Sequence, residues 1–124
     1  MGIFASAIAE FGNRLNLPGL TPGASGRVDL SIEKLGRLQI EEADGFALVT
    51  LARPWPAHAA RAALTALDLC HWRENHPWPL NAGAKDGEWL LFTAGIPLPD
   101  FSLPELERAL NHLSGLLDAV EKAG

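Results

Sequence analysis

The fold is decided by residues 27–52, which read RVDLSIEKLGRLQIEEADGFALVTLA. The first part consists of two runs, separated by Gly36, in which apolar and polar residues alternate. A period of two places the apolar side chains on one face of a strand, so these runs predict a half-buried antiparallel hairpin. The run 46–52 is almost continuously apolar, which is typical of a central strand covered on both faces.

Helical patterns flank the strands on both sides. Phe4, Ile8 and Phe11 recur at spacings of four and three, and the last helix has Ser102 as a candidate N-cap. The expected elements are helix 3–15, strands 27–33, 37–41 and 46–52, helix 57–72, strands 80–85 and 88–94, and a helix over 103–120. This order, α-β-β-β-α-β-β-α, predicts an α+β fold: one domain over 1–124, with helices packed on an antiparallel twisted sheet.

The composition excludes several classes of function. Of 124 residues, 48% are apolar and 20% charged, which is a surplus of apolar residues for a small globular domain. The net charge of −5 argues against nucleic acid or an anionic membrane as the main partner, since both need clustered cations. We expect no signal peptide, no membrane insertion and, with Cys70 as the single cysteine, a reducing cytoplasmic location.

No residue pattern indicates catalysis. His71 and His76 are five apart with no second cysteine nearby, a spacing that does not suit a metal site on one helix. The sequence has no G-x-S-x-G nucleophile motif and no phosphate-binding loop with its lysine. We therefore expect no catalytic residue, no metal and no cofactor, and interpret the chain as a protein that is not an enzyme.

The predicted helix 57–72 has more apolar surface than one sheet can cover. Its clearly polar positions fall within an arc of roughly 80°, and the remaining positions are apolar or alanine. A second polypeptide is one cover for this surface, and tight packing on the chain's own sheet is the other. Trp78, between two prolines, is likewise either a plug of the core or an anchor for a partner. The candidate dimer-interface residues are Ala60, Ala63, Leu64, Leu67 and Trp78.

The order of elements, the acidic charge and the apolar surplus together resemble the class I chaperones of bacterial type III secretion, which have the CesT/SycE-like fold. Within that group the chain is most similar to the SycN branch. The similar segments are Gly26-Arg27-Val28-Asp29-Leu30, Gly36-Arg37-Leu38-Gln39-Ile40-Glu41, Leu51-Ala52-Arg53, Pro79-Leu80-Asn81-Ala82-Gly83 and Leu103-Pro104. They extend over nearly the whole chain, but each is short and mostly structural.

The resemblance implies a dimeric chaperone without enzymatic activity. Such a chaperone pairs with itself or with a second small chaperone, and holds the extended N-terminal segment of a secreted protein. For the SycN branch the implied cargo is a YopN-like gatekeeper. The expected location is the bacterial cytoplasm, with peripheral association at the secretion apparatus. The expected cargo-binding anchors, on the first helix and the first hairpin, are Phe4, Ile8, Phe11, Leu38 and Ile40. The alternative is a small α+β interaction or regulatory domain unrelated to secretion.

Overall fold

The computed structural model describes residues 2–17, 19–20, 26–33, 35–54, 66, 77–85 and 88–122. Its elements are α1 (Ile3–Arg14), β1 (Arg27–Ile32), β2 (Gly36–Ala43), β3 (Phe46–Pro54), β4 (Leu80–Lys85), β5 (Trp89–Pro97), the short 3-10 helix η1 (Leu98–Asp100) and α3 (Leu103–Lys122). The predicted helix 57–72 lies outside the described residues except for Ala66, which is helical and buried.

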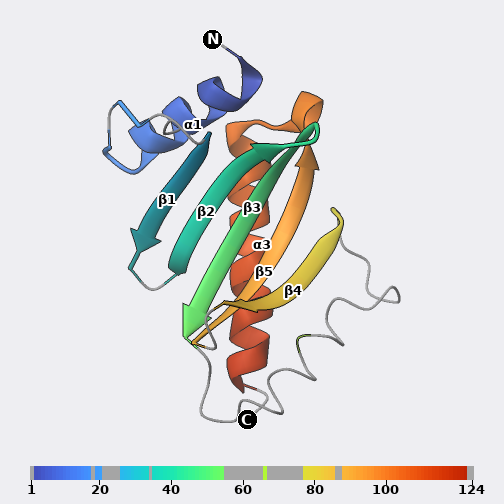
Figure 1. The fold of residues 1–124 in the computed structure, drawn as a ribbon. Coiled ribbons are helices and arrows are strands. Elements are labelled where there is room, and N and C mark those ends of the chain that lie inside the picture. Colours follow the sequence, from blue (N-terminus) through green and yellow to red (C-terminus); the bar gives the residue numbers. More distant parts are fainter. Residues whose placement is uncertain are drawn as a thin grey trace.

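The strands form a single antiparallel sheet in the order β1-β2-β3-β5-β4 (Figure 1). The predicted α+β class is confirmed, and β3 is the central strand, as predicted; of the described helices, α3 covers one of its faces and none covers the other. Within the described part of the chain, β1 and β4 are the two edge strands, because each pairs with one neighbour only.

Two glycines fix the path of the first three strands. At the β2–β3 turn, Asp44 and Gly45 have φ values of 52° and 84°. Positive φ at both central residues matches the twist of the flanking strands, and it explains the Asp-Gly pair. At the β1–β2 turn, Gly36 has φ of 130°, and a side chain there would overlap the backbone oxygen of Ala52 on β3. Both positions therefore require glycine.

Helix α3 packs along one face of the sheet and begins at the predicted cap. The backbone N–H of Glu105 donates to the Ser102 hydroxyl over 3.3 Å, which satisfies one of the free donors of the first turn. In Figure 1, α3 runs behind the strands, while α1 lies beside the start of β1 and contacts η1 and α3. Phe4 of α1 stacks on Phe101, with ring centroids 5.5 Å apart, so the two helices share one core.

The two faces of the sheet therefore differ. On the side of α3, side chains from every strand meet those of α1 and α3. The fully buried ones among them are Ile8, Leu38, Ile40, Val49, Leu51, Phe92, Ile96, Leu106, Leu113, Leu117 and Val120. The opposite side, which we call the open face, faces the viewer in Figure 1 and is covered by none of the described elements.

Candidate protein-binding surfaces

All five predicted cargo anchors lie in the chain's own core. They are nearly inaccessible, with Phe4 the most exposed at 6% and Ile8, Leu38 and Ile40 at 0%. Phe11 is 2% exposed and packs in the same cluster. The prediction that these five residues are surface anchors is therefore wrong. The periodicity of a helix or strand shows which of its faces is buried, but not whether the chain itself or a partner covers that face. The binding of cargo to α1 and the first hairpin stays a prediction, and it has to use other side chains.

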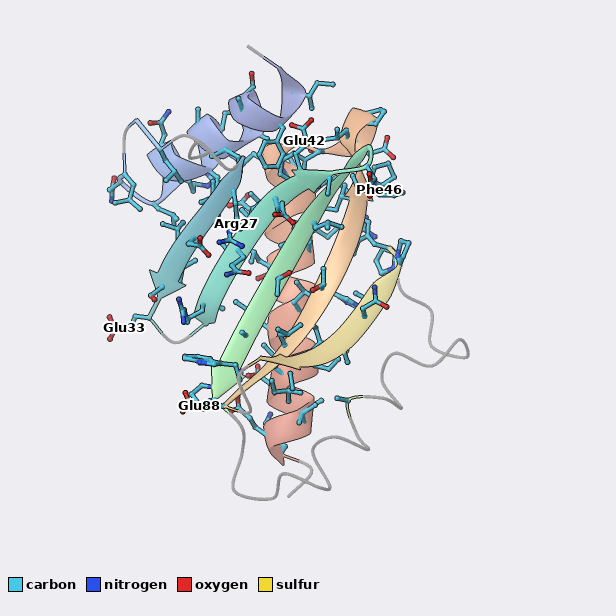
Figure 2. All side chains as sticks on the ribbon, in the orientation of Figure 1. Arg27, Glu33, Glu42, Phe46 and Glu88 are labelled. Atoms are coloured by element: carbon cyan, nitrogen blue, oxygen red, sulfur yellow. The ribbon has the colours of Figure 1, made fainter. Side chains whose placement is uncertain are left out.

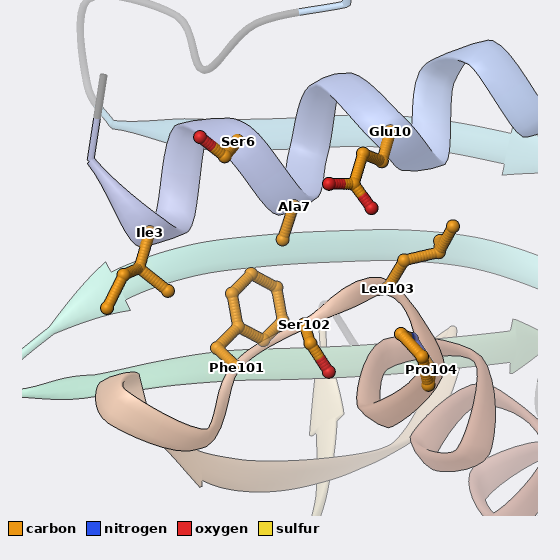
Figure 3. A pocket seen from close by; sticks show the side chains of 8 residues that line it. All are labelled: Ile3, Ser6, Ala7, Glu10, Phe101, Ser102, Leu103 and Pro104. Atoms are coloured by element: carbon orange, nitrogen blue, oxygen red, sulfur yellow. The ribbon is translucent and has the colours of Figure 1, made fainter.

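Exposed apolar side chains of α1 lie beside grooves in the surface. Ile3 is 54% exposed and lies at the mouth of a groove between α1 and the start of α3, which we call the α1–α3 groove (Figure 3). Its volume is about 290 Å³. The groove is lined by Ile3, Ser6, Ala7, Glu10, Phe101, Ser102, Leu103 and Pro104. The Glu10 carboxylate is the only charged group among these lining residues. The others are apolar or weakly polar.

Two further grooves lie at the two ends of β1. The β1-start groove, of about 390 Å³, is lined by Gly2, Ile3, Phe4, Ala5, Gly26, Glu42 and Leu98. The β1-end groove, of about 360 Å³, is lined by Phe11, Leu15, Ile32, Leu35, Glu107, Leu110 and Asn111. Among the described strands, β1 pairs with β2 alone, so its other edge has unpaired backbone groups between these two grooves.

Of the predicted dimer-interface residues, the structure describes Trp78 only. Trp78 is 6% exposed and packs against α3, where its Nε1–H donates to Glu105 over 3.2 Å. The Arg108 guanidinium lies 5.4 Å from the Trp78 ring, and the His112 ring meets it edge-on at 6.0 Å. Trp78 is therefore a plug of the core in this structure, not an exposed anchor. Ala60, Ala63, Leu64 and Leu67 lie outside the described residues.

Arg53 has a structural role that the sequence did not reveal. At the end of β3, its guanidinium donates to the Leu35 carbonyl over 2.6 Å and to the Ser114 hydroxyl over 3.0 Å. It also binds the carboxylates of Asp118 and Glu121 on α3, at 2.6 and 2.9 Å. Arg53 thus joins the β1–β2 turn and the central strand to α3. The only sequence signal was its place in the family-like segment Leu51-Ala52-Arg53, which carries no indication of partners.

The ion pairs around α3 are mostly at the surface. The hydrogen bond from Arg53 is the main reason why the pKa of Asp118 is lowered; desolvation opposes it, and the charges of Arg53 and Lys122 add to the lowering. Arg14 at the end of α1 reaches Glu107 of α3 with two exposed contacts of 3.2 Å. The described residues contain no group of three or more potential metal ligands.

No helix in the described part of the chain has the length and apolarity that a membrane crossing requires. The described residues form a sheet with one helix-covered face, a free edge strand between two grooves, and an open face.

The fold is similar to those of several solved protein complexes, among them complexes of chaperones. The ExsC–ExsE complex matches with a TM-score of 0.71 at 21% identity, over 98% of this chain and 92% of the other. The HopA1–SchA chaperone–effector complex matches with a TM-score of 0.67 at 18% identity, over 97% and 91%. The Yersinia pestis type III secretion chaperone SycH, in complex with a fragment of YscM2, matches with 0.66 at 17% identity, over 98% and 99%. The fold is that of the class I type III secretion chaperones.

The sequence identifies the family within that class. Residues 4–121 match the family described as type III secretory system chaperone SycN, and the chain belongs to this family. None of the curated proteins matches it. The predicted resemblance is therefore confirmed at the level of the family, and the protein is a type III secretion chaperone.

Proposed function

We propose that the chain binds the extended N-terminal segment of a secreted protein along the free edge of β1, and keeps that segment unfolded for secretion. The observation that carries this proposal is the position of the edge between the β1-start and β1-end grooves. An added strand would take its affinity from backbone hydrogen bonds and its specificity from apolar side chains that enter the grooves. β1 has six residues, so the paired part of the cargo is roughly 20 Å long.

The chemistry of β1 indicates what kind of segment fits. On the side of the core, Leu30 and Ile32 are half-buried and continue the apolar surface to the edge. On the other side, Arg27 and Asp29 are exposed and form an ion pair of 3.3 Å. The matching cargo strand alternates apolar residues toward α1 with polar or charged residues toward solvent.

Family membership supports the remaining parts of the proposal. The chain acts as a dimeric chaperone in the bacterial cytoplasm, without catalysis, and associates peripherally with the secretion apparatus. Its cargo, by the resemblance to the SycN branch, is a YopN-like gatekeeper. The alternative of an interaction domain unrelated to secretion is not favoured, because the family match covers residues 4–121.

Two apolar residues of similar exposure provide the test of the cargo site. Ile3 is 54% exposed and lines both the α1–α3 groove and the β1-start groove, whereas Leu17 is 44% exposed and lines none of the three grooves. Binding of a fluorescent N-terminal segment of the candidate gatekeeper is measured by anisotropy. Ile3→Asp should weaken it about tenfold or more, since a buried isoleucine contributes roughly 1.5–3 kcal/mol. Leu17→Asp should bind as the wild type does.

Equal binding by the wild type and Ile3→Asp would remove α1 and its grooves from the cargo site. Equal losses in both variants would indicate a general effect of charge, because Leu17 lines none of the three grooves. Circular dichroism of each variant controls for the fold.

A further inference from the structure

The α1–α3 groove contains a carboxylate that has no partner among the described residues. Glu10 is exposed on α1, and within the described ranges it makes no hydrogen bond and no ion pair. Figure 3 shows its side chain pointing from α1 into the groove, on the side of Leu103 at the start of α3. Since the other lining residues are uncharged, Glu10 is the one charge among them that an occupant of the groove would meet.

The basic residue best placed to neutralise Glu10 binds elsewhere. Arg14 follows Glu10 by four positions on α1, a spacing at which side chains of opposite charge can meet on one side of a helix. The Arg14 guanidinium instead contacts both carboxylate oxygens of Glu107 on α3, each at 3.2 Å. Glu107 lines the β1-end groove. The carboxylate of the β1-end groove is therefore neutralised within the chain, whereas that of the α1–α3 groove is not.

The stability of α1 does not account for a carboxylate at position 10. A negative charge stabilises a helix when it lies in the first turn, and the first turn of α1 contains no acidic residue. Glu10 lies in the second half of this 12-residue helix, where the helix dipole does not stabilise a carboxylate. The carboxylate thus has neither an ion-pair partner in the described structure nor a role in capping its helix.

The neighbouring β1-start groove has the same character. It shares Ile3 with the α1–α3 groove, and Glu42 is the charged residue among its described lining. Glu42 is exposed and, like Glu10, is unpaired in the part of the chain that the structure describes. Figure 2 shows Glu42 at the end of the sheet beside α1. Because Ile3 belongs to both linings, the two grooves adjoin, and a segment that continues past the start of β1 would meet both carboxylates.

The chemistry of the lining selects the occupant. A wholly apolar segment would remove water from the Glu10 carboxylate without replacing its hydrogen bonds, which is costly, and an acidic segment would be repelled. A lysine or arginine suits both parts of the lining, because its methylene groups pack on apolar surface while its charged end reaches the carboxylate. The net charge of −5 attracts a basic segment at longer range as well.

We propose that Glu10 is a specificity determinant for cargo: it binds a lysine or arginine, flanked by apolar residues, where the cargo segment passes through the α1–α3 groove. The inference rests on the proposed function for the identity of the occupant, and it adds the class of sequence that the chain prefers. The β1-end groove, whose carboxylate is paired with Arg14, has no such preference for a basic side chain.

The test is the capture of peptides from a displayed library of random sequences by the purified full chain. Lysine or arginine beside apolar residues should be roughly twofold to fivefold more frequent among the peptides captured by the wild type than by Glu10→Gln, since a surface ion pair contributes modestly to affinity. The matched control is Glu33→Gln, which removes the same charge from an exposed residue that lines none of the three grooves. Figure 2 shows Glu33 at the opposite end of β1 from Glu42. This control should capture the same peptides as the wild type.

An exchange of charges gives a second readout. One captured peptide is synthesised with a fluorescent label in two forms, one with its basic residue and one with glutamate in that place. Anisotropy should show that the wild type prefers the basic form and that Glu10→Lys prefers the glutamate form, because the exchange restores opposite charges across the groove. Circular dichroism checks the fold of each variant.

Three outcomes would overturn the proposal. One is an equal frequency of basic residues in the peptides captured by the wild type and by Glu10→Gln. Another is an equal decrease in Glu10→Gln and Glu33→Gln, because the net charge and not the groove would then select the peptides. The third is an order of affinities that Glu10→Lys leaves unchanged. In all three cases the proposed function stands if Ile3→Asp still captures fewer peptides than the wild type. A wild type that captures no peptide at all would count against the proposed function and this inference together.

Discussion

The two faces of the sheet are built from the same strands and have opposite environments. Phe92 and Leu91 are neighbours on β5, yet Phe92 is 0% exposed beneath α3 whereas Leu91 lies half-buried on the open face. The alternation along a strand determines only which way each side chain points. Burial is determined by what packs on that face, and α3 covers one face alone. The apolar surplus of the sequence is thus divided between a core and the open face.

The largest expected difference between the two faces is in the free energy of unfolding. Phe92→Ala should lower the free energy of unfolding by about 3–5 kcal/mol, because it leaves a cavity in a packed core. Leu91→Ala should change it by less than about 1 kcal/mol when the chain is monomeric. Urea unfolding at low protein concentration measures both. Similar losses in the two variants would mean that the open face is covered within the monomer.

The second-largest expected effect is the loss of stability when the Arg53 contacts between the sheet and α3 are removed. Arg53→Leu should destabilise the fold by about 1–3 kcal/mol, because the Leu35 carbonyl and two carboxylates lose a charged donor. The melting temperature at neutral pH measures this loss. An unchanged melting temperature would show that α3 is held by apolar packing alone.

The same variant should respond differently to acid. The pKa of Asp118 is lowered in the fold, so its contribution to stability is present above the ordinary aspartate pKa and is lost as the pH falls through the lowered value. Arg53→Leu removes the hydrogen bond that causes this shift. Melting curves between neutral pH and about pH 2 should show a smaller acid-induced loss in the variant than in the wild type. Parallel curves would contradict the role of Arg53.

A smaller effect is expected at Trp78. Trp78→Phe keeps the ring but removes the Nε1–H that Glu105 accepts, so the loss should be about 0.5–1.5 kcal/mol with an unchanged mass in light scattering. A variant that loses the dimer without losing stability would restore Trp78 as a partner anchor.

The smallest effect concerns the exposed pair between Arg14 and Glu107. Ion pairs at such positions contribute little because water and salt screen them. Arg14→Ala should leave the melting temperature unchanged within error, at low salt and at high salt. A clear salt-dependent loss would mean that this contact fixes α1 on α3.

The sequence was sufficient to predict the described helices and strands, but not what packs against each of them. Period-two alternation on both sides of Gly36 predicted the first hairpin, and Ser102 predicted the start of α3, because these signals are local. The five anchors on α1 and β2 were assigned to the surface although the fold buries them. An apolar periodicity is the same whether the chain's own helix or a partner covers it, and only the three-dimensional arrangement distinguishes the two.

Two features of the site depend on residues far apart in the sequence. The partners of Arg53 are on the β1–β2 turn and on α3, 18 and 65 positions away for Leu35 and Asp118. The α1–α3 groove combines residues from the two ends of the chain, since α1 and the start of α3 line it together. Neither long-range arrangement has a local signature, and hence neither could be predicted from motifs.

The most direct test of the cargo site is amide hydrogen exchange of the chain with and without the N-terminal segment of its cargo. If the segment adds a strand to β1, the amides of Arg27–Ile32 gain protection on binding, while those of Leu80–Lys85 at the opposite edge exchange as before. Protection at the β4 edge with unchanged exchange at β1 would contradict cargo binding along β1.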